Sequence, residues 1–81
     1  MGTVMREPGW RFVIHSDDHA PPHVHAIRRG GGEAKVTIPR PDERVAVLRV
    51  KDLPTHEAMR AVRMVEEHRA HLMLAWEKIH G

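Results

Sequence analysis

Histidine residues gather in one short segment of the chain. Eight of the 81 residues are histidine, and none is cysteine. His23 and His25 are two residues apart, so in an extended strand both imidazoles project from the same face, about 6–7 Å apart at the backbone. Such a pair can share one metal ion, here with nitrogen and oxygen ligands only. The sequence predicts a site for Zn²⁺, Ni²⁺ or Fe²⁺ formed by His15, His19, His23, His25 and Asp17.

The same segment also predicts a chemistry that needs no metal. Imidazole titrates at about pH 6.5, so a cluster can supply both a general acid and a general base. The candidate catalytic residues are His19, His23 and His25. Basic side chains could hold a phosphate, as a small ribonuclease would require. The candidate phosphate or nucleic-acid contacts are Arg11, Arg28, Arg29 and Lys35.

A third interpretation is structural. The imidazoles could bond backbone carbonyls, or the carboxylates of Asp17 and Asp18 in the segment between them. The residue types alone leave the three interpretations open, and with them whether the protein is an enzyme.

The distribution of charge is more informative than its sum. The formal net charge is +2 with neutral histidines, but residues 28–51 contain seven basic and three acidic side chains. Ten of the thirteen cations are arginine, which suits bidentate contact with phosphate or carboxylate. This basic middle segment is compatible with a nucleic-acid ligand, and equally with an ordinary solvated strand surface.

Alternating hydrophobicity predicts the strands that position these residues. Residues 3–6 and 10–15 read as a hairpin around a Glu-Pro-Gly turn. Residues 23–28 can form a third strand, with His23 and His25 on one face. Residues 33–38 and 44–50 alternate in the same way. We therefore expect a mostly antiparallel meander of four to five strands within residues 3–50, in which Glu33 and Lys35 could share the face of the two histidines.

The last third of the chain reads as a helix. Asp52, Pro54 and Thr55 indicate its start, and apolar residues at helical spacing predict one long helix over about residues 54–79, packed on one face of the sheet. Such a helix would be about 40 Å long, whereas a compact domain of this size is roughly 30 Å across. Its far end is therefore predicted to overhang the sheet or to meet a partner protein, or a second copy in a homodimer. The predicted partner interface comprises Leu72, Trp76 and Ile79.

Length and composition favour one α+β domain over residues 1–81. Hydrophobic residues make up 41% of the chain and charged residues 30%, as in a soluble globular protein. No run approaches the roughly 18 apolar residues of a membrane span, and the first residues lack the apolar core of a signal peptide. The absence of cysteine excludes a disulfide framework and favours a reducing cytoplasm.

Several segments together resemble a known bacterial family, domain of unknown function 4160. They are residues 18–25 (DHAPPHVH), 31–35 (GGEAK) and 76–81 (WEKIHG), with Arg69 and, near the start, residues 3–4 (TV) and 9–12 (GWRF). The Pro-Pro-His-Val-His core is the most specific of these. Members of the family are stand-alone proteins of about this size, and their genes often lie beside another small uncharacterised family, in pairs that resemble toxin–antitoxin modules.

The resemblance implies a small bacterial cytosolic protein that is one component of such a pair, with a small partner protein encoded nearby. The histidine cluster and the basic middle segment would then bind or act on nucleic acid. Two alternatives remain: an antitoxin-like regulatory module that binds protein through its long helix, and a small metalloprotein with His and Asp ligands. The family supplies no established activity and no catalytic residues.

Overall fold

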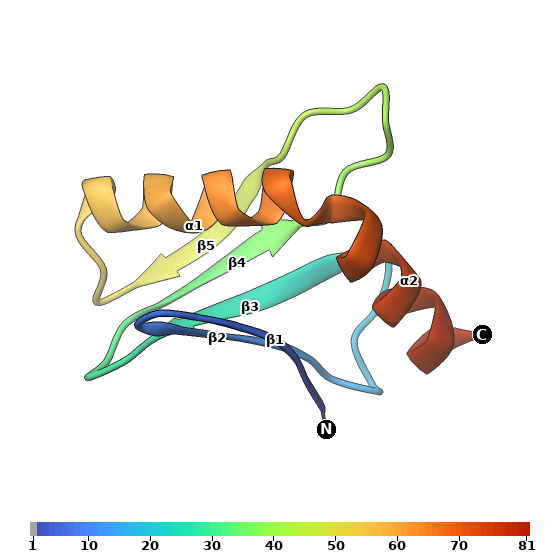
Figure 1. Ribbon diagram of the computed structural model, residues 1–81, viewed down its shortest axis with the longest axis horizontal. Coiled ribbons are helices and arrows are strands. Elements are labelled where there is room, and N and C mark those ends of the chain that lie inside the picture. The colour runs from blue at the N-terminus through green and yellow to red at the C-terminus, as the bar shows by residue number, and fades with distance from the viewer. Residues whose placement is uncertain (1) are drawn as a thin grey trace.

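A five-stranded antiparallel sheet is followed by two helices in the computed structural model, which describes residues 2–81 (Figure 1). The strands lie side by side in chain order. They are β1 (Gly2–Glu7), β2 (Trp10–Ile14), β3 (His23–Arg28), β4 (Glu33–Thr37) and β5 (Val47–Lys51). The helices are α1 (Thr55–Glu67) and α2 (Arg69–His80). The predicted α+β meander is confirmed.

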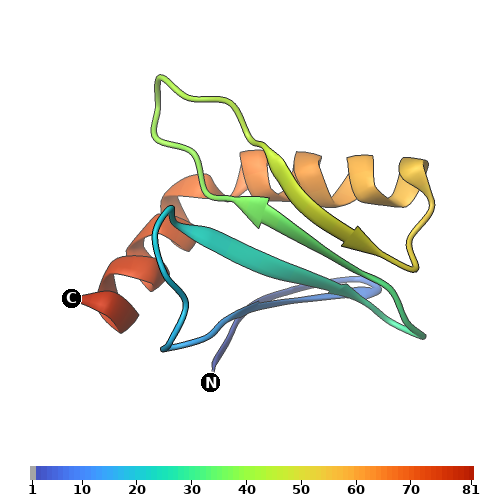
Figure 2. The same ribbon diagram turned by 180° about the vertical axis from the view of Figure 1, so that it is seen from behind.

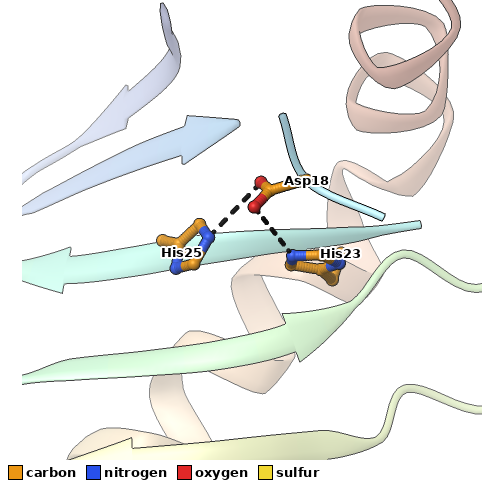
Figure 3. A group of neighbouring side chains, drawn as sticks. All are labelled: Asp18, His23 and His25. Carbon is orange, nitrogen blue, oxygen red and sulfur yellow. Dashed lines mark ion pairs between the residues drawn. The ribbon is translucent and has the colours of Figure 1, made fainter. Parts of the chain in front are cut away.

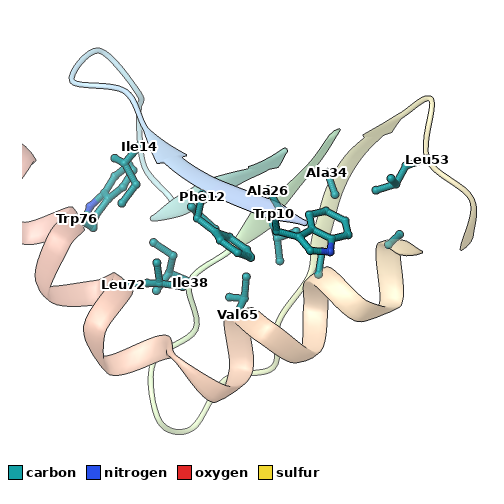
Figure 4. Packing of buried hydrophobic residues seen from close by; sticks show 14 residues of the cluster. Trp10, Phe12, Ile14, Ala26, Ala34, Ile38, Leu53, Val65, Leu72 and Trp76 are labelled. Atoms are coloured by element: carbon teal, nitrogen blue, oxygen red, sulfur yellow. The ribbon is translucent and has the colours of Figure 1, made fainter. Parts of the chain in front are cut away.

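The core lies between one face of the sheet and the helices (Figure 4). In β2, the alternate residues Trp10, Phe12 and Ile14 are at most 5% exposed and point toward the helices. Leu72 and Trp76 of α2 pack into the same cluster. Burying each such side chain contributes about 1.5–3 kcal/mol, so this layer holds β2 and β3 firmly beneath the helices.

The C-terminal third forms two helices rather than the single helix predicted over about residues 54–79. The break is at His68, whose backbone (φ −114°, ψ 20°) leaves the helical region and whose N–H is shared between the carbonyls of Met64 and Val65. A straight helix of about 40 Å would overrun a molecule measuring 33 × 28 × 21 Å. The bend turns α2 away from the axis of α1 (Figure 1), brings it into contact with β1 and β2, and returns Leu72 to the core.

Gly32 fixes the turn before β4. Its φ is +94°, and a Cβ atom there would lie 2.5 Å from the backbone oxygen of Asp52. A side chain would therefore be strained by its own backbone and would also collide with the connection between β5 and α1. The glycine lets this turn close against that connection, and it sets the position of Glu33, the next residue.

The face of the sheet turned away from the helices is called here the open face (Figure 2). Directly opposed residues of neighbouring strands share a face, so the strand register defines two rows across it. The histidine row is Val13, His25, Lys35 and Arg49. The arginine row is Arg6, Arg11, Ile27, Glu33 and Lys51. The expectation that Glu33 and Lys35 share the face of His25 is confirmed.

Candidate metal centre

The loop between β2 and β3 folds back over the start of β3 and carries Asp18 with it. The backbone N–H of His15 donates to Oδ2 of Asp18 at 3.0 Å, and the backbone N–H of Asp18 donates to the carbonyl of His15 at 3.1 Å. These reciprocal bonds form a tight turn of the kind that aspartate favours. As a result, the Asp18 carboxylate is only 13% exposed.

Two buried histidines of β3 face that carboxylate (Figure 3). His23 is 3% exposed and His25 is 8% exposed. Nε2 of His23 lies 3.4 Å from Oδ1 of Asp18, and Nε2 of His25 lies 3.4 Å from Oδ2. Ligand atoms on a tetrahedral ion with bonds of about 2.0–2.1 Å lie roughly 3.3–3.4 Å apart. One ligand atom from each of the three residues lies within 4.8 Å of the others.

The second nitrogen of each ring is already bonded. Nδ1 of His23 is 2.9 Å from the carbonyl oxygen of Pro21, and Nδ1 of His25 is 3.2 Å from Oε2 of Glu33. A carbonyl and a carboxylate oxygen only accept, so Nδ1 carries the proton in both rings. In a neutral imidazole this leaves Nε2 as a bare lone pair. Among the described residues, neither Nε2 atom has a hydrogen-bond partner.

In this arrangement, hydrogen-bond acceptors face one another: the Nε2 atoms of the two rings and the carboxylate oxygens of Asp18. Both contacts between Nε2 and Asp18 are close enough for an ion pair, yet neither has hydrogen-bond geometry. Neutral rings would place lone pairs against carboxylate oxygens in a nearly dry site, which is unfavourable. Either protonation of the rings or a cation between the three groups relieves this. Metal-binding histidines characteristically donate their other N–H to a carbonyl or carboxylate, as both rings do here.

The carboxylate is held in its charged form. Burial raises the pKa of Asp18, but the hydrogen bond from the His15 backbone and the nearby His23 and His25 rings together lower it more. The net effect is a pKa below the ordinary value of 3.8. Near neutral pH, the Asp18 carboxylate is therefore anionic rather than protonated.

The structure brings together only part of the predicted ligand set. His23 and His25 converge, whereas Asp17 and His19 are exposed and the described carboxylate of the cluster is Asp18. The His15 ring packs against the His25 ring, with centroids 4.7 Å apart, so it lies next to the cluster. The sequence cannot distinguish these two adjacent aspartates, because the conformation of the loop decides which one turns inward.

Besides Asp18, two contributors to the site lie outside the predicted set. Glu33 orients His25, as described above. Trp76 of α2 packs against His23, with ring centroids 5.4 Å apart, and His80 stacks on Trp76 at 3.7 Å. The strand alternation placed Glu33 on the correct face and so offered a signal. No sequence signal indicated the contact between Trp76 and His23, because this contact depends on the bend at His68.

The residues predicted for a partner interface lie mostly in the core of the protein. Leu72 is fully buried, Trp76 is 8% exposed, and Ile79 is half-buried against the core. The large apolar side chain of α2 that is exposed is Leu74, at 60%. The helix end therefore closes over its own sheet in this structure.

A hollow of about 220 Å³ beside the cluster connects it to solvent. Asp18, His23, Lys35 and Leu48 contribute to its wall, and so do the exposed predicted ligands Asp17 and His19. Of the four predicted phosphate contacts, Lys35 is therefore the one next to the histidines. Arg11, Arg28 and Arg29 lie together at the opposite end of β3, where they line a separate cleft.

A family model described as Domain of unknown function (DUF4160) matches residues 9–77. The chain belongs to this family. The match covers β2 through most of α2 and includes all three side chains of the candidate centre. Comparisons with curated proteins and with solved structures found no match. Within residues 2–81, no helix is both long enough and apolar enough to cross a membrane.

Proposed function

We propose that this protein binds a divalent metal ion between Asp18, His23 and His25. One observation carries the proposal: two buried imidazoles present unpartnered Nε2 atoms to a single carboxylate while their Nδ1 atoms are bonded to acceptors. A divalent cation would convert the opposed lone pairs into ligands. Protonating both rings instead would bury two like charges with ring centroids 5.4 Å apart, which is costly.

The ligand set suits a reactive centre rather than a closed structural one. Two imidazoles and one carboxylate leave positions for water or a substrate. Zn²⁺ with three protein ligands lowers the pKa of bound water to about 7, and Fe²⁺ with this ligand set supports oxygen chemistry. The hollow next to His23 gives the open positions a route to solvent, and Lys35 at its wall would attract an anionic substrate.

Metal analysis of protein purified without a His tag or a nickel column tests the proposal. We expect one divalent ion per chain in the wild type, and loss of that ion in Asp18→Asn and His23→Gln. The matched controls are Asp17→Asn and His19→Gln, which make the same chemical changes at exposed neighbouring positions. Both controls should retain the metal, because their side chains lie outside the cluster.

Two outcomes would contradict the proposal. The first is sub-stoichiometric metal in the wild type, with no binding when Zn²⁺, Ni²⁺ or Fe²⁺ is added to the folded protein. The second is loss of metal in Asp17→Asn and His19→Gln but not in Asp18→Asn, which would restore the broader ligand set expected from sequence. Circular dichroism of every variant separates loss of metal from loss of fold.

Acid–base chemistry on nucleic acid is a second use of the same residues. It is favoured by Lys35, which lies directly opposite His25 and lines the hollow with His23. RNA cleavage that persists in a chelator and disappears in His25→Ala would support it. Cleavage that a chelator abolishes would instead assign the chemistry to a metal. The candidates His19, His23 and His25 can be compared by single substitutions in the same assay.

A protein-binding role is favoured by the outer strand β5. Val47, Leu48 and Val50 are 42–46% exposed, and in the described chain no strand lies beyond β5. Exposed edge strands accept a further strand from a partner. A small protein encoded nearby, as in a toxin–antitoxin-like pair in the cytoplasm, would bind here. Co-expression with the neighbouring gene product should give a complex that Leu48→Lys weakens and Leu74→Lys does not.

A further inference from the structure

Four arginines meet at the end of the sheet farthest from the histidines. Arg6 and Arg11 are directly opposed on β1 and β2. Arg28 ends β3, and the backbone N–H of Arg29 donates to the carbonyl of Gly9 at 2.8 Å, which ties the end of β3 to the β1–β2 turn. Together they line a cleft of about 480 Å³. The cleft is thus cationic because the strand register brings these arginines to the same end of the sheet.

The charges of this cleft are not balanced by the protein itself. Among residues 2–81, none of the four guanidinium groups forms an ion pair with a carboxylate. The one acidic residue in the wall is Glu7, whose Oε2 lies 3.7 Å from Nε2 of His68. Like charges placed directly opposite in a sheet are destabilising, so the register of Arg6 and Arg11 lowers stability unless an anion lies between them.

Further cations continue from the cleft across the open face. Lys51 ends the arginine row, where it lies directly opposite the acidic Glu33, and Lys35 and Arg49 stand opposite each other in the histidine row. The two rows are two residues apart along the strands, or about 6–7 Å. The face therefore offers several anion positions rather than one. The aromatic residues of the chain, Trp10, Phe12 and Trp76, are all buried, and Trp10, which contributes to the wall of the cleft, is only 5% exposed. This site therefore offers bases little aromatic surface on which to stack.

We propose that the arginine cleft binds the phosphodiester backbone of a nucleic acid, without base specificity, and that the strand continues over the open face. Arginine forms paired hydrogen bonds to phosphate oxygens, and a chain of phosphates matches a series of cation positions better than a single small anion does. The contacts in the arginine cleft do not involve the metal centre, because the cleft lies at the opposite end of β3. The continuing strand would pass Lys35, which lies directly opposite His25.

Fluorescence anisotropy of a labelled single-stranded oligonucleotide, measured over a range of salt concentrations, tests this inference. Removing two phosphate contacts in Arg6→Gln/Arg11→Gln should flatten the dependence of log K on log salt by about 1.4 and weaken binding at least tenfold at low salt. The matched control, Arg63→Gln/Arg69→Gln, removes the same charge from exposed helix positions. It should leave the slope unchanged.

Three results would overturn the inference: equal weakening in the control pair, which would indicate net charge alone; no measurable binding of the oligonucleotide; or binding of pyrophosphate in the cleft without binding of the oligonucleotide. Circular dichroism and metal content of the cleft variant should match the wild type. A wild-type protein that binds the oligonucleotide but holds no metal would count against the metal centre and leave the nucleic-acid inference standing.

Discussion

The two ends of β3 treat charged and titratable side chains in opposite ways. At the His23 end, two buried imidazole rings converge with the largely shielded carboxylate of Asp18. At the Arg28 end, guanidinium groups gather around an open cleft and have no carboxylate partner among the described residues. Buried groups with fixed orientations select a small ion of defined geometry, whereas solvated cations select a large anion mainly by charge. One strand thus connects two candidate sites of different selectivity.

The largest effect outside the ligands themselves is expected from Glu33→Ala. His25 then loses the partner that fixes its Nδ1 proton and its ring orientation, and metal affinity should fall about 10–100-fold. Competition against a chromophoric chelator measures the change, and Glu66→Ala on the exposed side of α1 is the control. Unchanged metal affinity with altered oligonucleotide binding would assign Glu33 to the cationic face and break the contrast between the two ends.

The next effect concerns acid stability of the metal-free protein. The folded pKa of Asp18 lies below 3.8, so the unfolded chain binds this proton more readily. The stabilisation by Asp18 is therefore complete above that value and is lost as the pH falls through the lower folded pKa. Urea unfolding at pH values on both sides of 3.8 should show a shallower pH dependence in Asp18→Asn than in the wild type. Asp17→Asn should keep the wild-type slope; equal slopes in all three proteins would contradict this.

The smallest effect is expected at the arginine end, and it has the opposite sign. Replacing Arg6 by threonine removes the like-charge pair with Arg11 and should raise the free energy of unfolding by about 0.2–1 kcal/mol at low salt. The gain should shrink as salt is added. Arg11→Thr should give a similar gain, and the double variant less than the sum. Destabilisation by either change would mean that the pair is not repulsive.

Sequence patterns were sufficient where a feature depends on local periodicity. Alternation placed His23 and His25 on one face of a strand, with Glu33 and Lys35 on the same face of the next, and the register confirms both. The helical stripe identified Leu72 and Trp76 as apolar-face residues. It could not reveal the break at His68, since no glycine or proline marks it and the stripe continues through it. The bend fits a segment whose straight length of about 40 Å would exceed the longest dimension of the molecule, 33 Å.

By itself, the sequence determined the kind of ligand available: imidazole and carboxylate without thiolate, and arginine in excess of lysine. It also determined the strand that carries both histidines, because polar and apolar residues alternate there with a period of two. Only the tertiary structure decided that Asp18 rather than Asp17 turns inward, that Trp76 closes over His23, and that Arg6 stands opposite Arg11. Each of these depends on how a loop, a bend or a register brings distant backbone together, and such long-range placement leaves no local pattern to read.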